Sequence, residues 1–159
     1  NWAGVGKMLN SEFGTSDVVI ATTAAGAIPY YSELETVDML GINDRYVARN
    51  GYSYIELAGH RVRSPLNYLI SQDVNLLIAH PEVLRKSSDS PTWRYQDRRS
   101  IFIPFWEWRQ IPESAQFLEL PMGTTHILLV IYLSRHPDVE ELIRRENLIT
   151  WPIEVISNS

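Results

Sequence analysis

The sequence contains no cysteine among its 159 residues. This absence excludes a disulfide framework, a thiol nucleophile and a zinc site built on cysteine. It does not identify the compartment, because a cysteine-free chain folds equally well on either side of a membrane. With 45% hydrophobic residues, a chain of this length buries enough apolar surface to fold without a metal or a disulfide. We therefore expect one ordinary globular domain.

Basic residues and long apolar runs are also scarce. The 14 Lys and Arg residues face 19 Asp and Glu residues, and the formal net charge is −5. A negative surface repels phosphate backbones, so we expect no nucleic-acid partner. The longest uninterrupted apolar run, residues 127–133, is far shorter than the ~20 residues of a membrane-spanning helix. The chain starts at Asn1 without a signal peptide, and helical apolar spacing begins at Trp2. The simplest explanation is a piece cut from a longer protein, and a processed terminus would look the same.

Strand-like and helix-like segments alternate in the first half of the chain. Three short apolar runs, residues 18–23, 36–40 and 74–79, predict buried strands. The segments between them carry helix signals, with Asn43 at an expected N-cap and Pro65 at an expected first helical position. This alternation predicts a parallel α/β sheet.

The second half has a different pattern. Residues 86–100 are polar and predict a loop or an insertion. Residues 116–120 and 126–133 predict two strands whose short joint allows only an antiparallel pairing. A helix with well-placed charges begins at Pro137. The sequence therefore predicts a single soluble α/β domain over residues 1–159, with a central mostly parallel sheet, helices on both faces and an antiparallel C-terminal strand pair.

Conventional catalytic signatures are missing. The sequence has no P-loop, no G-x-S-x-G elbow and no H-E-x-x-H motif. The four histidines stand at no metal-ligand spacing from one another, and two of them, His80 and His136, precede proline as residues of loops or strand ends do. We therefore expect neither a metal nor a cofactor.

Polar and aromatic side chains follow the first two predicted strands. In an open α/β sheet, the loops that leave the carboxyl ends of neighbouring strands converge on one crevice, where ligands bind. Asp38 lies in an otherwise apolar strand, so it must find donors or face a cleft. The candidate ligand-binding residues in and after these loops are Tyr30, Tyr31, Asp38, Asp44, Arg45, Arg49 and His60.

Each candidate also has a purely structural interpretation. Asp38 can accept backbone N–H bonds, or pair with Arg45 or Arg49 in a buried salt bridge. Asp44 can place a negative charge at the N-terminus of a helix, and we favour this role over contact with a ligand. The tyrosine pair can be half-buried core, and His60 can satisfy a loop carbonyl. The density of polar groups in a few loops favours a site.

A second group of aromatic and arginine residues lies in and after the polar segment. Aromatic faces stack on sugar rings, and arginines bind phosphates bidentately. Tryptophan with arginine also suits the headgroup zone of a membrane. Trp93 joins the candidate ligand-binding set, whereas Trp106 and Trp108 alternate as along a strand, which would make one of them core.

Several motifs together resemble a known family. They are Gly26-Ala27-Ile28-Pro29-Tyr30-Tyr31-Ser32, the run Asp38-x-x-Gly41-x-x-Asp44, Gly59-His60, and a strand ending near His80-Pro81. The chain resembles, over most of its length, the C-terminal soluble domain of multi-spanning bacterial membrane glycosyltransferases of the GT-C class, which include arabinofuranosyltransferases. Arg61 departs from the family pattern, which leaves its role open.

The resemblance implies that the catalytic carboxylate lies in a membrane portion absent from this chain, so we expect no catalytic residue here. It implies a polyprenyl-phosphate sugar as donor and a cell-envelope glycan as acceptor. The domain would lie over the membrane active site on the extracytoplasmic face of the cell membrane. Its partners would be the glycan or the lipid-linked sugar, the transmembrane portion of the same protein, and the membrane surface.

Three hypotheses follow, in order of preference. The first is an accessory domain that binds glycan without chemistry of its own. In it, the tyrosine pair and Trp93 offer stacking faces, the two aspartates and His60 bond sugar hydroxyls, and Arg45 and Arg49 orient the carboxylates or contact a phosphate. The second is a structural module that packs on the membrane bundle. The third is a hydrolase that uses one aspartate with His60 as an acid–base pair.

Overall fold

The computed structural model describes residues 1–153 apart from residue 59 and residues 87–97. Six strands form one mixed sheet in the order β2-β1-β5-β7-β6-β8. Their bounds are β1 Val19–Thr22, β2 Glu35–Asp38, β5 Leu76–Arg85, β6 Gln116–Met122, β7 His126–Tyr132 and β8 Thr150–Pro152. Strands β2, β1 and β5 are parallel, whereas β7 is antiparallel to β5 and β6, and β8 is antiparallel to β6. The α/β class and the antiparallel β6–β7 pair are therefore confirmed, and the parallel strands occupy one end of the sheet.

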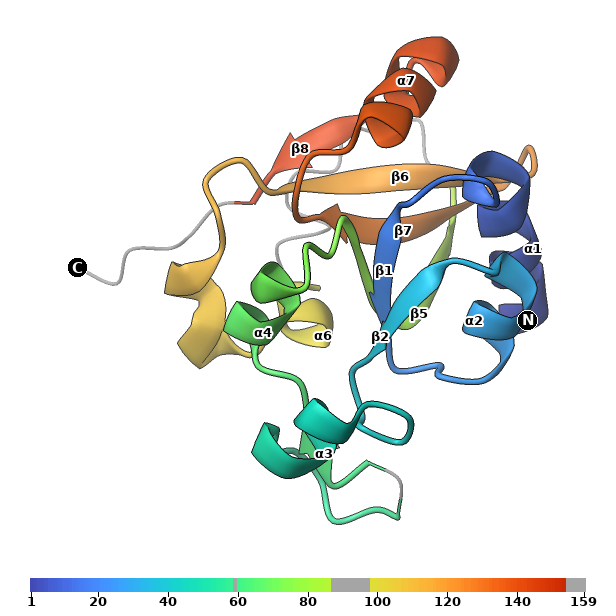
Figure 1. Ribbon diagram of the computed structural model, residues 1–159. Helices are drawn as coiled ribbons and strands as arrows, with labels where there is room; N and C mark the ends of the chain where they lie inside the picture. Colours follow the sequence, from blue (N-terminus) through green and yellow to red (C-terminus); the bar gives the residue numbers. More distant parts are fainter. Residues whose placement is uncertain (59, 87–97, 154–159) are drawn as a thin grey trace.

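Helices cover both faces of the sheet (Figure 1). One face packs against α1 Trp2–Phe13, α2 Ala27–Ser32 and α7 Pro137–Glu146, and the other against α4 Leu66–Ser71, α6 Arg99–Phe102 and the 3-10 helix η1 Phe105–Gln110. Alternate residues of each strand enter opposite cores: Leu128 and Val130 of β7 enter the first, and Leu129 and Ile131 the second. The apolar runs are continuous because both faces are buried.

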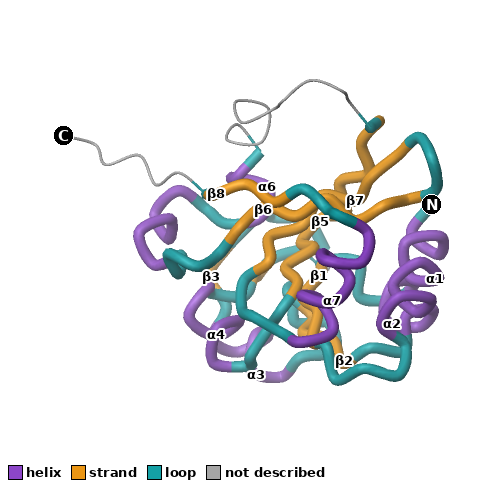
Figure 2. Tube along the Cα trace, turned by 90° about the horizontal axis from the view of Figure 1, so that it is seen from above, coloured by secondary structure: helices purple, strands orange, loops and turns teal. Residues whose placement is uncertain are grey.

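A small two-stranded unit lies beyond the carboxyl end of β2, at the bottom of Figure 1. It consists of α3 Arg45–Asn50 and the antiparallel hairpin of β3 Tyr52–Ser53 with β4 Val62–Arg63. Figure 2 shows that β3, α3 and α4 lie together, away from α1 and α2. Neither this hairpin nor β8 was expected from the sequence, because strands of two or three residues are too short to show an apolar period.

Two local predictions are wrong. The third strand does not end at residue 79 but continues through His80-Pro81. The pairing of β5 with β7 is interrupted between Leu77 and Glu82, so Pro81 is not required to donate a backbone hydrogen bond to β7. Trp106 and Trp108 lie in η1 rather than along a strand, although one of the two, Trp108, does pack partly buried against the core. Most of the polar segment 86–100, with Trp93, lies outside the described residues. Among the described helices, none is long and apolar enough to cross a bilayer.

Candidate functional site

A pocket of about 380 Å³ lies at the carboxyl ends of β1 and β2, beside His80 in the middle of β5. The loops after the first two strands converge here, which is where an open α/β sheet binds its ligands. The lining residues are Trp2, Thr23, Ala24, Ala25, Gly26, Ala27, Leu40, Ile42, Asn43, His60 and His80.

The irregularity in β5 shapes one wall of the pocket. Ala79 has a φ of 51°, in the left-handed region that L residues rarely adopt. Its carbonyl oxygen accepts hydrogen bonds from the Thr22 hydroxyl (2.9 Å) and from the Thr23 backbone N–H (3.0 Å) and hydroxyl (3.2 Å). These bonds hold the kink after which His80 lines the pocket. The His80 ring meets the Trp2 ring edge-to-face at 5.5 Å, so two aromatic side chains of the lining are in contact.

Asp38 holds the loop after β2. Its side chain is buried, and its two carboxylate oxygens accept the backbone N–H groups of Leu40 (2.9 Å) and Asn43 (2.5 Å). Gly41 has a φ of 68°, and a Cβ there would lie 2.6 Å from the backbone nitrogen of Ala48. The Asp-x-x-Gly run is therefore a tight turn that only glycine fits, and it positions the residues of this loop that line the pocket.

Asp44 begins the helix that follows this turn. Its carboxylate accepts the backbone N–H of Val47 (3.0 Å) and the hydroxyl of Tyr68 (3.0 Å). Desolvation, reinforced by this bond, raises the pKa of Tyr68 to about 12. The prediction that Asn43 caps α3 is wrong: the backbone N–H of Asn43 is still bonded to Asp38, so the helix begins one residue later.

Among the candidate residues that the structure describes, His60 lines the pocket. Its ring is half-buried, and its Nδ1 lies 3.3 Å from the carbonyl oxygen of Ala58. Within the described residues, no hydrogen bond joins His60 to Asp38 or Asp44, whose oxygens serve the turn and the helix cap. The described hydrogen bonds therefore include no pair of His60 with either aspartate.

The remaining predicted residues lie outside the pocket lining. Tyr30 and Tyr31 are on α2, and the Cβ of Tyr31 lies 2.7 Å from where a Cβ on Gly6 would be, so α1 and α2 touch there. Arg45 and Arg49 are exposed on α3, and neither pairs with Asp38 in the described part of the chain. Of the structural alternatives for Asp38, the structure shows backbone acceptance rather than a salt bridge.

Several polar or aromatic side chains of the lining were not among the candidates from the sequence, namely Trp2, Thr23, Asn43 and His80. His80 directly follows a predicted strand of the parallel sheet, so the rule that selected the first two loops would also have selected it. Asn43 was interpreted as a helix cap. Trp2 carries no signal, because it enters the pocket from a helix that precedes the sheet.

A family model for a domain of unknown function, DUF8728, matches residues 2–132. The chain belongs to this family. No curated protein and no solved structure matches the chain. Every residue that lines the pocket lies within the span of the DUF8728 match.

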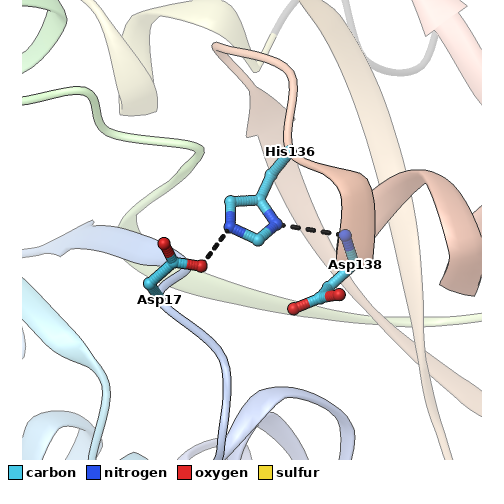
Figure 3. Close-up of side chains that lie close together, drawn as sticks. All are labelled: Asp17, His136 and Asp138. Carbon is cyan, nitrogen blue, oxygen red and sulfur yellow. Dashed lines mark hydrogen bonds and ion pairs between the residues drawn. The ribbon is translucent and has the colours of Figure 1, made fainter.

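A second polar cluster lies at the opposite end of β1 (Figure 3). Asp17, His136 and Asp138 hold potential metal-ligand atoms within 4.8 Å of one another. His136 Nδ1 accepts the backbone N–H of Asp138 (3.1 Å), so a neutral ring carries its proton on Nε2, which lies 2.8 Å from Asp17 Oδ1. Both ring nitrogens are engaged, whereas a metal ligand needs one free lone pair. The bond from His136 lowers the pKa of the Asp17 carboxyl.

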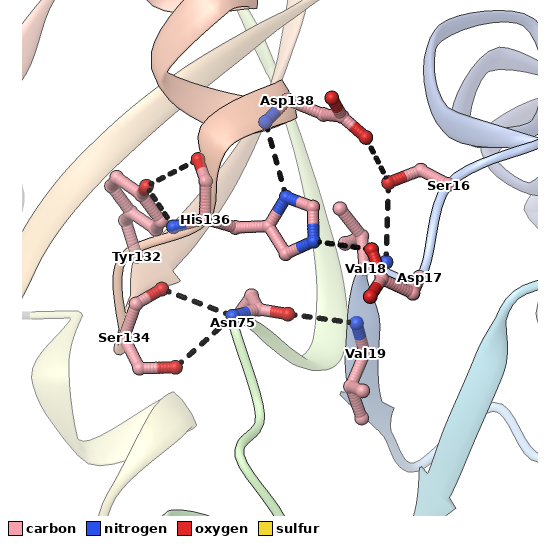
Figure 4. Close-up of polar contacts among 9 residues, drawn as sticks. All are labelled: Ser16, Asp17, Val18, Val19, Asn75, Tyr132, Ser134, His136 and Asp138. Atoms are coloured by element: carbon pink, nitrogen blue, oxygen red, sulfur yellow. Dashed lines mark hydrogen bonds and ion pairs between the residues drawn. The ribbon is translucent and has the colours of Figure 1, made fainter.

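This cluster belongs to a network that joins segments distant in the sequence (Figure 4). The Ser16 hydroxyl donates to the Asp138 carboxylate, and His136 is the N-cap of α7. Buried Asn75 accepts the backbone N–H of Val19 (2.9 Å) and donates to the Ser134 carbonyl (3.3 Å) and hydroxyl (3.1 Å). The amino end of the parallel strands is thus fastened by side chains, and the pocket lies at the carboxyl end. His136 and Asp138 lie outside the DUF8728 match.

Proposed function

We propose that this chain is an extracytoplasmic accessory domain of a membrane glycosyltransferase that uses polyprenyl-phosphate sugars, and that it binds the acceptor glycan. The observation that supports this function best is the pocket at the carboxyl ends of β1 and β2, beside His80 of β5. Its volume falls in the range of small-molecule sites, about 300–1,000 Å³. The motif resemblance supplies the context of cell-envelope polysaccharide assembly.

The pocket combines apolar faces with hydrogen-bonding groups, as sugar recognition requires. Trp2, with 44% of its surface exposed, offers a ring for the apolar face of a sugar. Asn43 and His60 offer an amide and an imidazole for hydroxyl groups, and Thr23 adds a half-buried hydroxyl. In this proposal Asp38 and Asp44 act by holding the loops rather than by touching the ligand.

The test is an NMR titration of the 159-residue chain with an arabinofuranosyl oligosaccharide. We expect shifts in the amides of residues 23–27 and 40–43. Trp2→Ala should weaken binding about tenfold, because it removes the stacking face. Ile149→Ala is the control, because it removes an exposed apolar side chain between α7 and β8. Shifts confined to other segments, or none at all, would reject glycan binding in this pocket.

The second candidate is a structural module that packs on the membrane bundle of the same protein. The observation in its favour is Asp38, whose carboxylate is buried and occupied by two backbone N–H groups. The two candidates differ in the effect of Trp2→Ala on transfer by the full-length protein. A glycan-binding domain loses transfer while its fold is unchanged, whereas a packing module keeps transfer.

A further inference from the structure

Exposed apolar side chains gather on the hairpin and the neighbouring 3-10 helix. We call this surface the hairpin face, and its members are Tyr54 (44% exposed), Ile55 (44%), Leu57 (56%), Phe105 (69%) and Trp106 (56%). Exposed apolar side chains that gather in one patch mark interaction sites, whereas single exposed apolar side chains are common on any protein surface.

Ring and cation contacts connect the part of the hairpin face on η1 with the part on the hairpin. The Trp106 ring contacts Phe105 at 5.2 Å and the Tyr52 ring at 5.5 Å. Tyr52 pairs with Arg63 across the hairpin, and the Arg63 guanidinium lies 5.0 Å from the centre of the Tyr54 ring. These contacts link η1 to the base of the hairpin and to Tyr54, and Ile55 and Leu57 follow Tyr54 along the chain.

The hairpin face is also held firmly. Arg63 is buried, and its Nη2 donates to the carbonyl oxygens of Ile101 (2.6 Å) and Phe102 (2.8 Å), just before η1. Its neighbour Glu107 is buried too and accepts the backbone N–H of Leu66 (3.1 Å). The bonds of Arg63 fasten β4 to α6, and the bond of Glu107 fastens η1 to the start of α4, so both parts of the hairpin face are anchored in the domain.

The charge around the hairpin face is opposite to that of the whole chain. Residues 45–63 and 105–110 hold four exposed arginines, Arg45, Arg49, Arg61 and Arg109. Among the described residues of the same two segments, the exposed acidic residue is Glu56. These segments therefore carry an excess of exposed positive charge, whereas the whole chain has a net charge of −5. An apolar surface edged with cations is complementary to a layer of anionic headgroups over hydrocarbon.

We propose that the hairpin face docks on the surface of a bilayer that contains anionic phospholipid. The aromatic rings would lie at the headgroup level, Ile55 and Leu57 would enter the acyl boundary, and the arginines would meet the phosphates. Aliphatic side chains at the tip of a projecting hairpin suit hydrocarbon, whereas single-stranded nucleic acid needs a basic groove with stacking rings. The inference does not depend on glycan binding, because no member of the hairpin face lines the pocket.

The test is co-sedimentation of the 159-residue chain with vesicles of phosphatidylcholine, and with vesicles that also contain phosphatidylglycerol. We expect binding to the anionic vesicles, weakened by salt, with a blue shift of tryptophan emission. Phe105→Ala and Trp106→Ala should each weaken binding about tenfold, and Arg49→Gln and Arg61→Gln about fivefold on anionic vesicles. Ile149→Ala, with 47% of its surface exposed, is the matched control and should bind as the unaltered chain does.

Circular dichroism of each variant shows that a loss of binding is not a loss of folding. Phe105 is the safest substitution, because its ring is the most exposed of the set. No binding to either vesicle, or equal binding by the variants and the unaltered chain, would overturn the proposal. A dimer that the Phe105 and Trp106 variants dissociate would also overturn it, since the hairpin face would then join two copies of this chain.

Discussion

Replacing Asp38 by Asn tests how the loop beside the pocket is built. The carboxylate accepts two backbone N–H bonds from a position that is 5% exposed. Asparagine has one acceptor oxygen, so it keeps one neutral bond and turns its NH₂ group toward the second N–H. A hydrogen bond to a charged group contributes about 1.5–3 kcal/mol, so Asp38→Asn should lower the free energy of unfolding by about 2–3 kcal/mol.

Urea unfolding followed by circular dichroism measures this loss. With a slope of about 2 kcal/mol per molar urea, the midpoint should fall by about 1–1.5 M. Asp38→Ala leaves both N–H groups without an acceptor and should cost about 3–5 kcal/mol. Glu35→Gln removes an exposed carboxylate from the same strand and should stay within about 0.5 kcal/mol of the unaltered chain. If Asp38→Asn stays within that range too, our account of the turn is refuted.

Three further predictions follow. Gly6→Ala should lower the free energy of unfolding by about 1–3 kcal/mol, because the new Cβ would lie 2.7 Å from the Cβ of Tyr31. Gly4→Ala on the same helix meets no atom within 4 Å and should raise the free energy of unfolding by up to about 1 kcal/mol. Equal urea midpoints of the two variants would contradict this prediction. His136→Ala should cost about 1 kcal/mol through the lost cap of α7, and His136→Asn should recover most of it; thermal unfolding that does not separate the two variants would argue against the cap. Burial raises the pKa of Glu107 in the folded chain above its ordinary value of 4.5. At a pH between 4.5 and the raised pKa, the folded chain therefore holds a proton on Glu107 that the unfolded chain releases. The free energy of unfolding should therefore fall as pH rises through this interval, and Glu107→Gln should remove that fall; an unchanged pH profile would count against the assignment.

Much of the fold follows from local patterns. The apolar runs mark strands because strands buried on both faces need continuous apolar sequence, and the charges of α7 match its ends. The antiparallel β6–β7 pair follows from a joint too short for a crossover. The continuation of β5 past His80-Pro81 does not follow, because a register shift depends on the partner strand.

The location of the candidate site could be predicted from the sequence, but the side chains that line it could not. The order of strands and helices was enough to locate the crevice at the carboxyl ends of β1 and β2. Asp38 and Asp44 were identified as polar residues near that crevice, yet the direction of a carboxylate depends on which backbone donors surround it. The face that a helix presents to the crevice is likewise a matter of packing, which is why Trp2 was missed.

The amino-acid sequence by itself determined the α/β class, the antiparallel C-terminal pair and the edge of the sheet where loops converge, because periodicity and connection length are local properties. The tertiary structure decided that Asp38 serves its own turn, that Trp2 and His80 meet at the pocket, and that η1 and the hairpin share one apolar face. These are contacts between residues far apart in the chain, and they exist only once the sheet has brought those residues together.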